Sequence, residues 1–195
     1  MSAKIKLNSA SGGGSFSLQA PSSSSNNRVL TLPDAADGTI ARTSEIVFSS
    51  YALLADRATT DRGSYTEGDW RTREINTEVS DEDGIVTLSS NQFTLQAGKY
   101  FIKFGCCCYK VGYHVVRLRN ITDSSDEGFA EGDYNRETAE VISFTRGATR
   151  INIASSKTFE VQGRVSATQN GNGMGFGMPY SVVADFTNVE IFKEV

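Results

Sequence analysis

Apolar and polar residues alternate with a period of two along most of the chain from about residue 46 onward, and this alternation limits the fold more than any other feature. In the middle of the chain, Tyr100, Ile102 and Phe104 alternate with Phe101 and Lys103. Successive side chains of an extended strand point to opposite faces, so a strand with this pattern is buried on one face only. The same alternation recurs at Val116–Arg119, Phe159–Val165 and Val189–Ile191. These segments are predicted to be half-buried strands.

Turn-forming residues separate these segments. Glycine, asparagine, aspartate and serine are concentrated in the connections, as in Asp83–Gly84, Ala97–Gly98 and Asn170–Gly173. Shorter strands are predicted at Ile85–Leu88, Phe93–Leu95, Val141–Thr145 and Ile151–Ile153. Residues 50–58 fit both a strand and a helical spacing, and a strand is expected there. Many short strands at close spacing predict an all-β fold, an antiparallel jelly-roll sandwich over residues 45–195.

Composition changes near residue 45, so an extended N-terminal segment, residues 1–44, is expected ahead of this domain. It contains Gly12–Gly14 and Ser22–Asn27 and few apolar residues, and it cannot build a core of its own. Short strands are predicted at Ile5–Leu7, Phe16–Leu18 and Val29–Leu32. Ordering costs about 1–2 kcal/mol per residue, so these strands need a partner, either other copies of the chain or a sheet edge on a larger assembly. The predicted anchoring residues are Phe16, Leu18, Val29, Leu30 and Leu32.

Charge and hydropathy exclude two classes of partner. The net charge is −4, and no basic stripe appears that could neutralise a run of phosphates. Nucleic acid is therefore not an expected partner. No apolar run approaches the roughly 18 residues that a membrane helix needs, and the first residues lack the apolar stretch of a signal peptide. Insertion into a membrane is not expected.

The cysteines and the single histidine argue against a catalytic or metal centre. Cys106, Cys107 and Cys108 are adjacent, so they cannot link distant parts of the chain by disulfides, and His114 cannot complete a zinc site with them. Packing as small buried side chains in a reducing compartment is the expected role of the cysteines. His114 lies in a strand-like run and no nucleophile motif accompanies it, so a packed or trimer-axis histidine is expected. No catalytic residue, cofactor or metal ligand is assigned.

Two acidic groups need separate treatment, at Asp81–Asp83 and Asp123–Glu127. Both lie in polar stretches without the aromatic neighbours that form a sugar platform, which argues against a glycosidase acid pair. Both groups are expected to lie in solvated turns. The alternative is a weakly bound calcium ion, because carboxylate oxygens are the hard ligands that calcium prefers.

Several ordered motifs resemble the C-terminal domain found on many tailed-phage fibre and virion proteins. They lie in the same order as in that family, over roughly residues 50–195: Gly68–Thr77, Leu88–Tyr100, His114–Asp123, Lys157–Gln162, Gly173–Gly177 and Val189–Lys193. The resemblance implies a jelly roll akin to the tumour necrosis factor and complement globular-head folds, which associate as trimers.

The N-terminal segment carries a second resemblance. Gly12–Pro21, Asn27–Asp34 and Asp37–Ile40 are similar to a segment that recurs in phage fibres and other appendages. Together the two resemblances imply a non-enzymatic homotrimeric virion protein, assembled in the host cytoplasm and exposed on the particle. They imply that it joins other virion proteins through its N-terminal segment and carries an outward jelly roll for attachment to a host-surface glycan or protein. A capsid-decorating protein and a polysaccharide depolymerase are the alternatives.

Aromatic residues with a polar handle are the candidates for a recognition surface. They are Tyr109, Tyr113, Tyr134 and Tyr180. A tyrosine ring suits both a core and a binding face, so the sequence alone does not separate the two uses. Trp70 is expected in the core or in a trimer interface, since a large ring is usually mostly buried.

Overall fold

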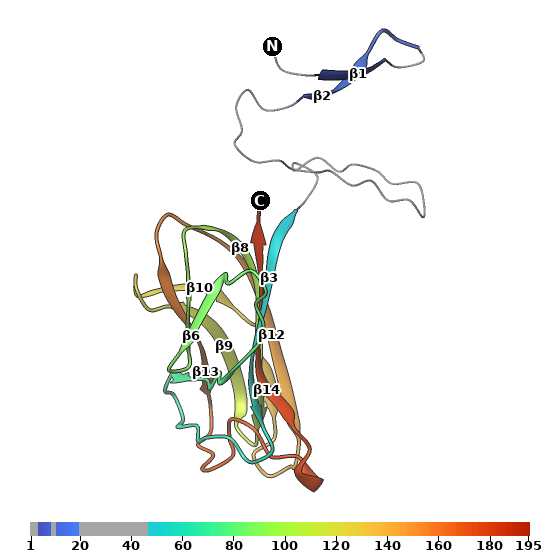
Figure 1. Ribbon diagram of the computed structural model, residues 1–195. Helices are drawn as coiled ribbons and strands as arrows, with labels where there is room; N and C mark the ends of the chain where they lie inside the picture. Colours follow the sequence, from blue (N-terminus) through green and yellow to red (C-terminus); the bar gives the residue numbers. More distant parts are fainter. Residues whose placement is uncertain (1–3, 9–10, 20–46) are drawn as a thin grey trace. The chain divides into compact units, whose positions relative to one another are not determined.

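The computed structural model describes residues 4–8, 11–19 and 47–195 (Figure 1). The chain divides into two compact units, Met1–Ile40 and Ala41–Val195. In the first unit, β1 (Lys4–Asn8) and β2 (Ser15–Gln19) form an antiparallel hairpin in which Ile5 pairs with Leu18 and Leu7 with Phe16. Two of the predicted N-terminal strands are thus confirmed, and they pair with each other. Val29, Leu30 and Leu32 lie outside the described residues.

The second unit consists of antiparallel strands in two sheets (Figure 1). The first, which we call the β9 sheet, has the order β10-β9-β13-β7-β6, with β11 paired to β9 and β4 paired to β13. The second, the β14 sheet, has the order β12-β8-β14-β3-β5. The strands are β3 (Phe48–Ala58), β4 (Arg71–Thr72), β5 (Thr77–Ser80), β6 (Val86–Ser89), β7 (Gln92–Leu95), β8 (Gly98–Tyr109), β9 (Gly112–Asn120), β10 (Ser125–Phe129), β11 (Asp133–Asn135), β12 (Ile142–Ile153), β13 (Lys157–Val165) and β14 (Ala184–Glu194).

Consecutive long strands alternate between the two sheets. β7, β9 and β13 belong to the β9 sheet, whereas β8, β12 and β14 belong to the β14 sheet. The first and last strands of the unit, β3 and β14, are neighbours. This winding confirms the predicted antiparallel jelly roll. Within the described residues, no helix is long and apolar enough to cross a membrane.

The core lies between the inner faces of the sheets, where the predicted alternation places it. Tyr100, Ile102 and Phe104 of β8 are buried, and Phe93 stacks on Phe159 with ring centroids 5.6 Å apart. The three adjacent cysteines are buried and free, as the packing role requires. Each large apolar side chain buried here stabilises the fold by roughly 1.5–3 kcal/mol.

A buried cation, Arg73, lies among these groups. Its guanidinium donates to the carbonyl oxygen of Met174 at 2.5 Å, to Oγ1 of Thr187 at 3.2 Å and to the hydroxyl of Tyr65 at 3.3 Å. All three acceptors are neutral. Burial opposes ionisation of the Cys106 thiol, but a hydrogen bond from Cys108 and the charge of Arg73 outweigh it and lower the pKa of Cys106 to about 7.

Two predictions about strands are wrong. The separate strands expected at Val141–Thr145 and Ile151–Ile153 are one continuous strand, β12, because polar outward residues interrupt the apolar pattern without interrupting the ladder to β8. The glycine run Gly171–Gly177 has no lysine and is followed by Pro179, which predicts a strand interior and not a phosphate-binding loop, but it begins with a turn over residues 171–174 and contains no strand. Close backbone approach does occur there, since a Cβ on Gly173 would lie 2.8 Å from the carbonyl oxygen of Gln169.

The two ends of the sandwich differ. At one end, Phe48 at the beginning of β3 pairs with Glu194 at the end of β14. We call this the arm-side end, because β3 follows the N-terminal segment, or arm, in the sequence. The C-terminus lies at this end (Figure 1). β8 begins here, because Tyr100 pairs with Lys193, and it runs to the opposite end, where it turns into β9. We call this opposite end the tip.

Candidate functional site

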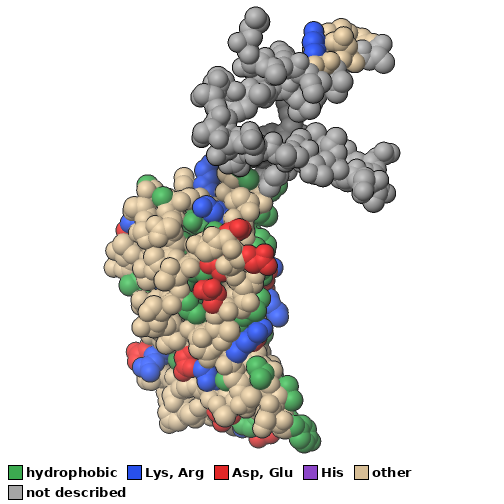
Figure 2. Space-filling model, in the orientation of Figure 1, with side chains coloured by type: hydrophobic (Ala, Val, Ile, Leu, Met, Phe, Trp, Pro, Cys, Tyr) green, Lys and Arg blue, Asp and Glu red, His purple; other side chains and the backbone are tan. Residues whose placement is uncertain are grey.

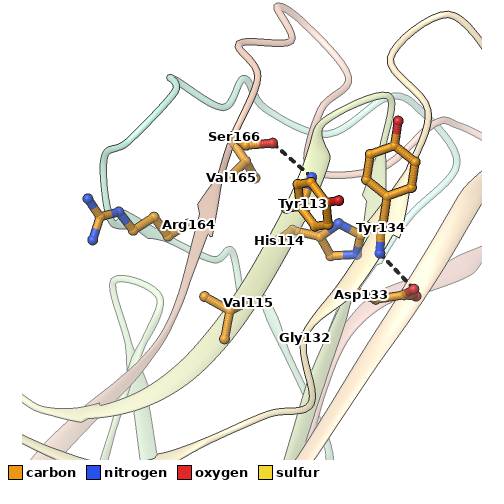
Figure 3. A pocket seen from close by; sticks show the side chains of 9 residues that line it. All are labelled: Tyr113, His114, Val115, Gly132, Asp133, Tyr134, Arg164, Val165 and Ser166. Carbon is orange, nitrogen blue, oxygen red and sulfur yellow. Dashed lines mark hydrogen bonds between the residues drawn. The ribbon is translucent and has the colours of Figure 1, made fainter.

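A pocket of about 640 Å³ opens at the tip, on the outer face of the β9 sheet (Figure 3). β9 contributes Tyr113 and Val115, β11 contributes Asp133 and Tyr134, and the end of β13 contributes Arg164. The remaining lining residues are His114, Gly132, Val165 and Ser166. In Figure 3, the tyrosines lie on one side and Arg164 on the other, with Ser166 and Val115 between them.

An exposed pair of tyrosine rings forms one wall. Tyr113 and Tyr134 are directly opposite each other in the β9–β11 ladder, so their side chains emerge on the same face. Their ring centroids are 4.8 Å apart with an interplanar angle of 48°. Tyr113 is 71% exposed and Tyr134 is 48% exposed. Two large rings left this open make this wall the candidate binding surface.

A buried polar network fixes the backbone beneath this pair. His114 Nδ1 bonds the carbonyl oxygen of Gly112 at 2.9 Å, and its Nε2 lies 2.8 Å from the hydroxyl of Ser143. Asn135 donates to the same hydroxyl at 2.9 Å and accepts from the backbone N–H of Val111 at 2.7 Å. Because His114 follows Tyr113 and Asn135 follows Tyr134, the network holds both tyrosines in place. Burial lowers the pKa of His114. His114 is therefore a packed histidine, as expected.

Polar groups complete the pocket. The backbone N–H of Tyr113 donates to Oγ of Ser166 at 2.8 Å, which leaves the hydroxyl proton of Ser166 free to donate. Oδ1 of Asp133 accepts from the backbone N–H of Tyr134 at 2.7 Å. Arg164 is exposed, and the ion pairs of the described residues do not include it. The pocket thus offers an aromatic wall, a hydroxyl, a carboxylate and a guanidinium.

Trp70 lies beside the pocket and is only half-buried, so the expectation that places it in the core is wrong. Arg117 stacks over its ring at 4.0 Å, and Arg164 lies 6.0 Å from the ring centroid. Phe129 packs at its edge at 6.3 Å. The ring is only half-buried because the outer face of the β9 sheet supplies arginine stems as its packing partners.

A second aromatic group, which we call the aromatic face, lies on the outer face of the β14 sheet at the arm-side end. It consists of Phe48, Tyr51, Phe101 and Phe192. Phe192 is central, with ring centroids 5.0 Å from Tyr51 and 5.2 Å from Phe48. Phe48 is 40% exposed and Tyr51 is 37% exposed. Since the sheets pack through their inner faces, the aromatic face and the pocket lie on opposite sides of the domain.

The other two predicted tyrosines do not join the pocket. Tyr109 is buried against Phe176, with ring centroids 5.0 Å apart. Tyr180 is 95% exposed in a short turn, Pro179–Ser181. Figure 2 shows apolar side chains projecting at the lower end of the view, and the exposed apolar residues of this stretch are Met178, Tyr180, Val182 and Val183. Sequence reasoning missed Arg164, Ser166 and Asn135, which reach the site only through the pairing of β9 with β13 and β11.

The two acidic groups of the sequence have different partners. Asp126 bridges Arg117 at 3.0 Å and Arg119 at 2.8 Å. Asp123 pairs with Lys157 at 2.5 Å, and Asp81 accepts from the backbone N–H of Ile85. In the part of the chain that the structure describes, no group of histidine, cysteine and acidic side chains is arranged to hold a metal ion.

Comparison with known proteins gives likeness in structure alone. No family model and no curated protein matches the sequence. The globular domain of zebrafish complement 1qA is 12% identical, with 74% of this chain and 96% of that chain covered and a TM-score of 0.48. Murine APRIL at pH 5.0 is 9% identical, with coverages of 73% and 98% and a TM-score of 0.48. Eiger TNF from S. frugiperda is 10% identical, with coverages of 76% and 94% and a TM-score of 0.47.

Proposed function

We propose that this protein is a structural protein of a tailed-phage virion, a homotrimeric tail fibre or appendage whose jelly roll attaches to the host surface through the Tyr113–Tyr134 pocket. The N-terminal segment joins it to other virion proteins. The observation that carries the proposal is the placing of the aromatic face and the pocket on opposite outer faces of the domain. The sequence motifs that resemble phage fibre proteins supply the setting.

The aromatic face supports self-association. The other three rings all pack on Phe192, yet Phe48 and Tyr51 remain partly open to solvent. Aromatic residues are enriched in the buried centres of protein interfaces, and an apolar cluster of this kind gains most from burial against a like surface. Next to it, Lys103 and Glu190 form an ion pair at 3.0 Å. A copy of the chain seated here covers the rings and leaves the β9 sheet outermost.

The pocket and the beginning of the jelly roll lie at opposite ends of the sandwich. β3 begins at the arm-side end, whereas Tyr113 follows the turn at the tip. A ligand can therefore reach the pocket when the aromatic face is covered by another copy of the chain.

Light scattering on the purified full chain tests self-association. The expected mass is three times the 21.1 kDa of one chain. Replacing Phe48 and Tyr51 together by Asp places charge in the aromatic face and lowers the mass to that of a monomer. Tyr180→Asp, at the most exposed tyrosine, serves as the matched control and keeps the trimer. A stable wild-type monomer at micromolar concentration contradicts the proposal.

Attachment is tested on the particle. Phage carrying Tyr113→Ala is expected to adsorb to host cells more slowly than phage carrying Tyr180→Ala. Labelled antibody viewed by negative-stain microscopy locates the protein, and signal confined to the head would assign it to capsid decoration. New reducing ends after incubation with host polysaccharide would instead assign a depolymerase.

A further inference from the structure

The size and wall of the pocket limit the kind of ligand it accepts. A volume of about 640 Å³ falls within the roughly 300–1,000 Å³ of small-molecule sites. The two tyrosine rings are tilted by 48° to each other and together form an aromatic wall of the pocket. The apolar face of a sugar ring packs on such a surface, while its hydroxyls meet the surrounding polar groups. A saccharide of one or two rings fits this description better than a folded protein partner.

We propose that the pocket binds an acidic saccharide, a sugar that carries a carboxylate. Tyr113 and Tyr134 form the stacking surface, and Arg164 is the contact for the carboxylate. This inference rests on the proposed function in host attachment and names the chemical class of its receptor.

Arg164 carries the charge argument. On the same face, Arg117 and Arg119 share the carboxylate of Asp126, so their charges are partly neutralised. Arg164 is exposed, lines the pocket, and has no place among the ion pairs of the described residues. A guanidinium binds a carboxylate through parallel hydrogen bonds, which gives both affinity and orientation. A carboxylate on the ligand is therefore the group that complements Arg164.

The remaining polar groups suit the hydroxyls of a sugar. Ser166 can donate its hydroxyl proton, because its oxygen already accepts from Tyr113. Asp133 lies beside Tyr134, on the opposite side of the pocket from Arg164 (Figure 3). Its carboxylate accepts sugar hydroxyls there without opposing the ligand's own negative charge. The two signs of charge are thus separated across the site.

Trp70 provides a direct readout. It is the only tryptophan of the chain, and Arg164 lies 6.0 Å from its ring centroid. A carboxylate that binds Arg164 changes the position of this cation relative to the ring. Binding is therefore expected to change the fluorescence of Trp70.

The experiment titrates the full chain with three probes: an oligogalacturonate, a sialic acid oligomer and a neutral malto-oligosaccharide. At least one acidic probe is expected to bind and to change the fluorescence, and the neutral probe is expected to bind far more weakly. The two acidic probes distinguish a uronic acid from a sialic acid as the source of the carboxylate. Affinity should fall as salt rises.

Variants separate the contributions. Arg164→Gln should weaken acidic-probe binding by about ten- to a hundredfold, the usual effect of losing a hydrogen-bonded ion pair. Arg71→Gln removes an equal charge from an exposed position of the neighbouring strand β4 and should change affinity by less than about twofold. Tyr113→Ala and Tyr134→Ala should abolish binding.

The failures are distinguishable. Unchanged acidic-probe affinity in Arg164→Gln, equal binding of the neutral probe, or no binding of any probe overturns the inference about charge. The attachment function stands in these cases if Tyr113→Ala phage adsorbs poorly. Normal adsorption by Tyr113→Ala phage overturns the attachment function itself.

Discussion

The hydroxyl oxygen of Ser143 lies 2.8 Å from Nε2 of His114, and this hydrogen bond joins β12 of one sheet to β9 of the other. The carbonyl of Gly112 can only accept, so Nδ1 of His114 carries the ring proton. With the ring proton on Nδ1, Nε2 of the neutral histidine accepts from the hydroxyl of Ser143, whose oxygen accepts from Asn135. Protonating Nε2 would reverse this bond and take away the acceptor of the Ser143 proton, so the network favours the neutral histidine.

Acidification is therefore expected to destabilise the fold through His114. Burial lowers its pKa in the folded state below the ordinary 6.5, so the unfolded chain takes up a proton first as pH falls. The contribution of neutral His114 to folding stability is complete above pH 6.5. It is lost as the pH falls towards the folded pKa, with a slope of at most about 1.4 kcal/mol per pH unit. Denaturant unfolding from about pH 7.5 to about pH 5.5 measures it. His114→Asn should remove this slope, and an equal slope in the variant would contradict the assignment.

Asn135 is expected to contribute more to the free energy of unfolding than small polar residues usually do. Its side chain is buried and bonds Val111, Cys108 and Ser143. Asn135→Ala leaves these groups without partners and should lower the free energy of unfolding by about 3 kcal/mol. Asn152→Ala, at an exposed position of β12, is the control and should cost less than about 0.5 kcal/mol. Similar losses in the two variants would show that the network stabilises nothing.

Cys106 is expected to be partly ionised near neutral pH, because a hydrogen bond from Cys108 and the charge of Arg73 favour its thiolate. Ultraviolet absorbance of the thiolate should show a titration in the native protein near pH 7, the pKa of Cys106, and Cys106→Ser should lose it. Arg73→Met removes the charge and should move this titration upward, whereas Arg73→Lys should retain it in part. The ordinary pKa of a thiol is 9.0, so the contribution of the Cys106 thiolate to folding stability is present above pH 9.0 and is lost as pH falls through about 7. A native protein without any thiolate signal below pH 9.0 would refute the pairing.

Removal of residues 1–44 is expected to leave a folded trimer that no longer enters virions. The core cluster of the described residues begins at Ala52, so the truncation takes nothing from it. Phe16→Asp with Leu18→Asp should have the same effect with little change in melting temperature. Gel filtration, thermal melting and immunoblots of purified particles measure the three properties. Normal incorporation of the truncated chain would mean that the jelly roll itself attaches to the particle.

The sequence predicts the fold well because a strand buried on one face alternates apolar and polar residues along the chain. The alternation around Ile102 and Val161 reflects one buried face, and both residues are in the core. Trp70 shows the limit of this reasoning. Its partner Arg117 is distant in the sequence, so no local pattern predicts the stack that keeps the ring at the surface.

Of the candidate site, the sequence predicts only the two tyrosines. Tyr113 and Tyr134 are conspicuous because tyrosines suit binding surfaces, but Tyr109 is equally conspicuous and is buried. The register of β11 against β9 distinguishes them, and local sequence does not encode register strongly. Arg164 enters through the pairing of β13 with β9, another long-range contact.

The pairing of Phe48 with Glu194 brings the entrance and the exit of the jelly roll to neighbouring strands. A domain with adjoining ends behaves as a cassette: it can be inserted into a surface loop of another protein without stretching either linker. The same closeness permits a circular permutant, with residue 195 joined to residue 47 by a short bridge and new ends opened in an exposed turn such as Asn170–Gly171. The adjoining first and last strands thus make the sandwich suitable for transfer between carrier proteins.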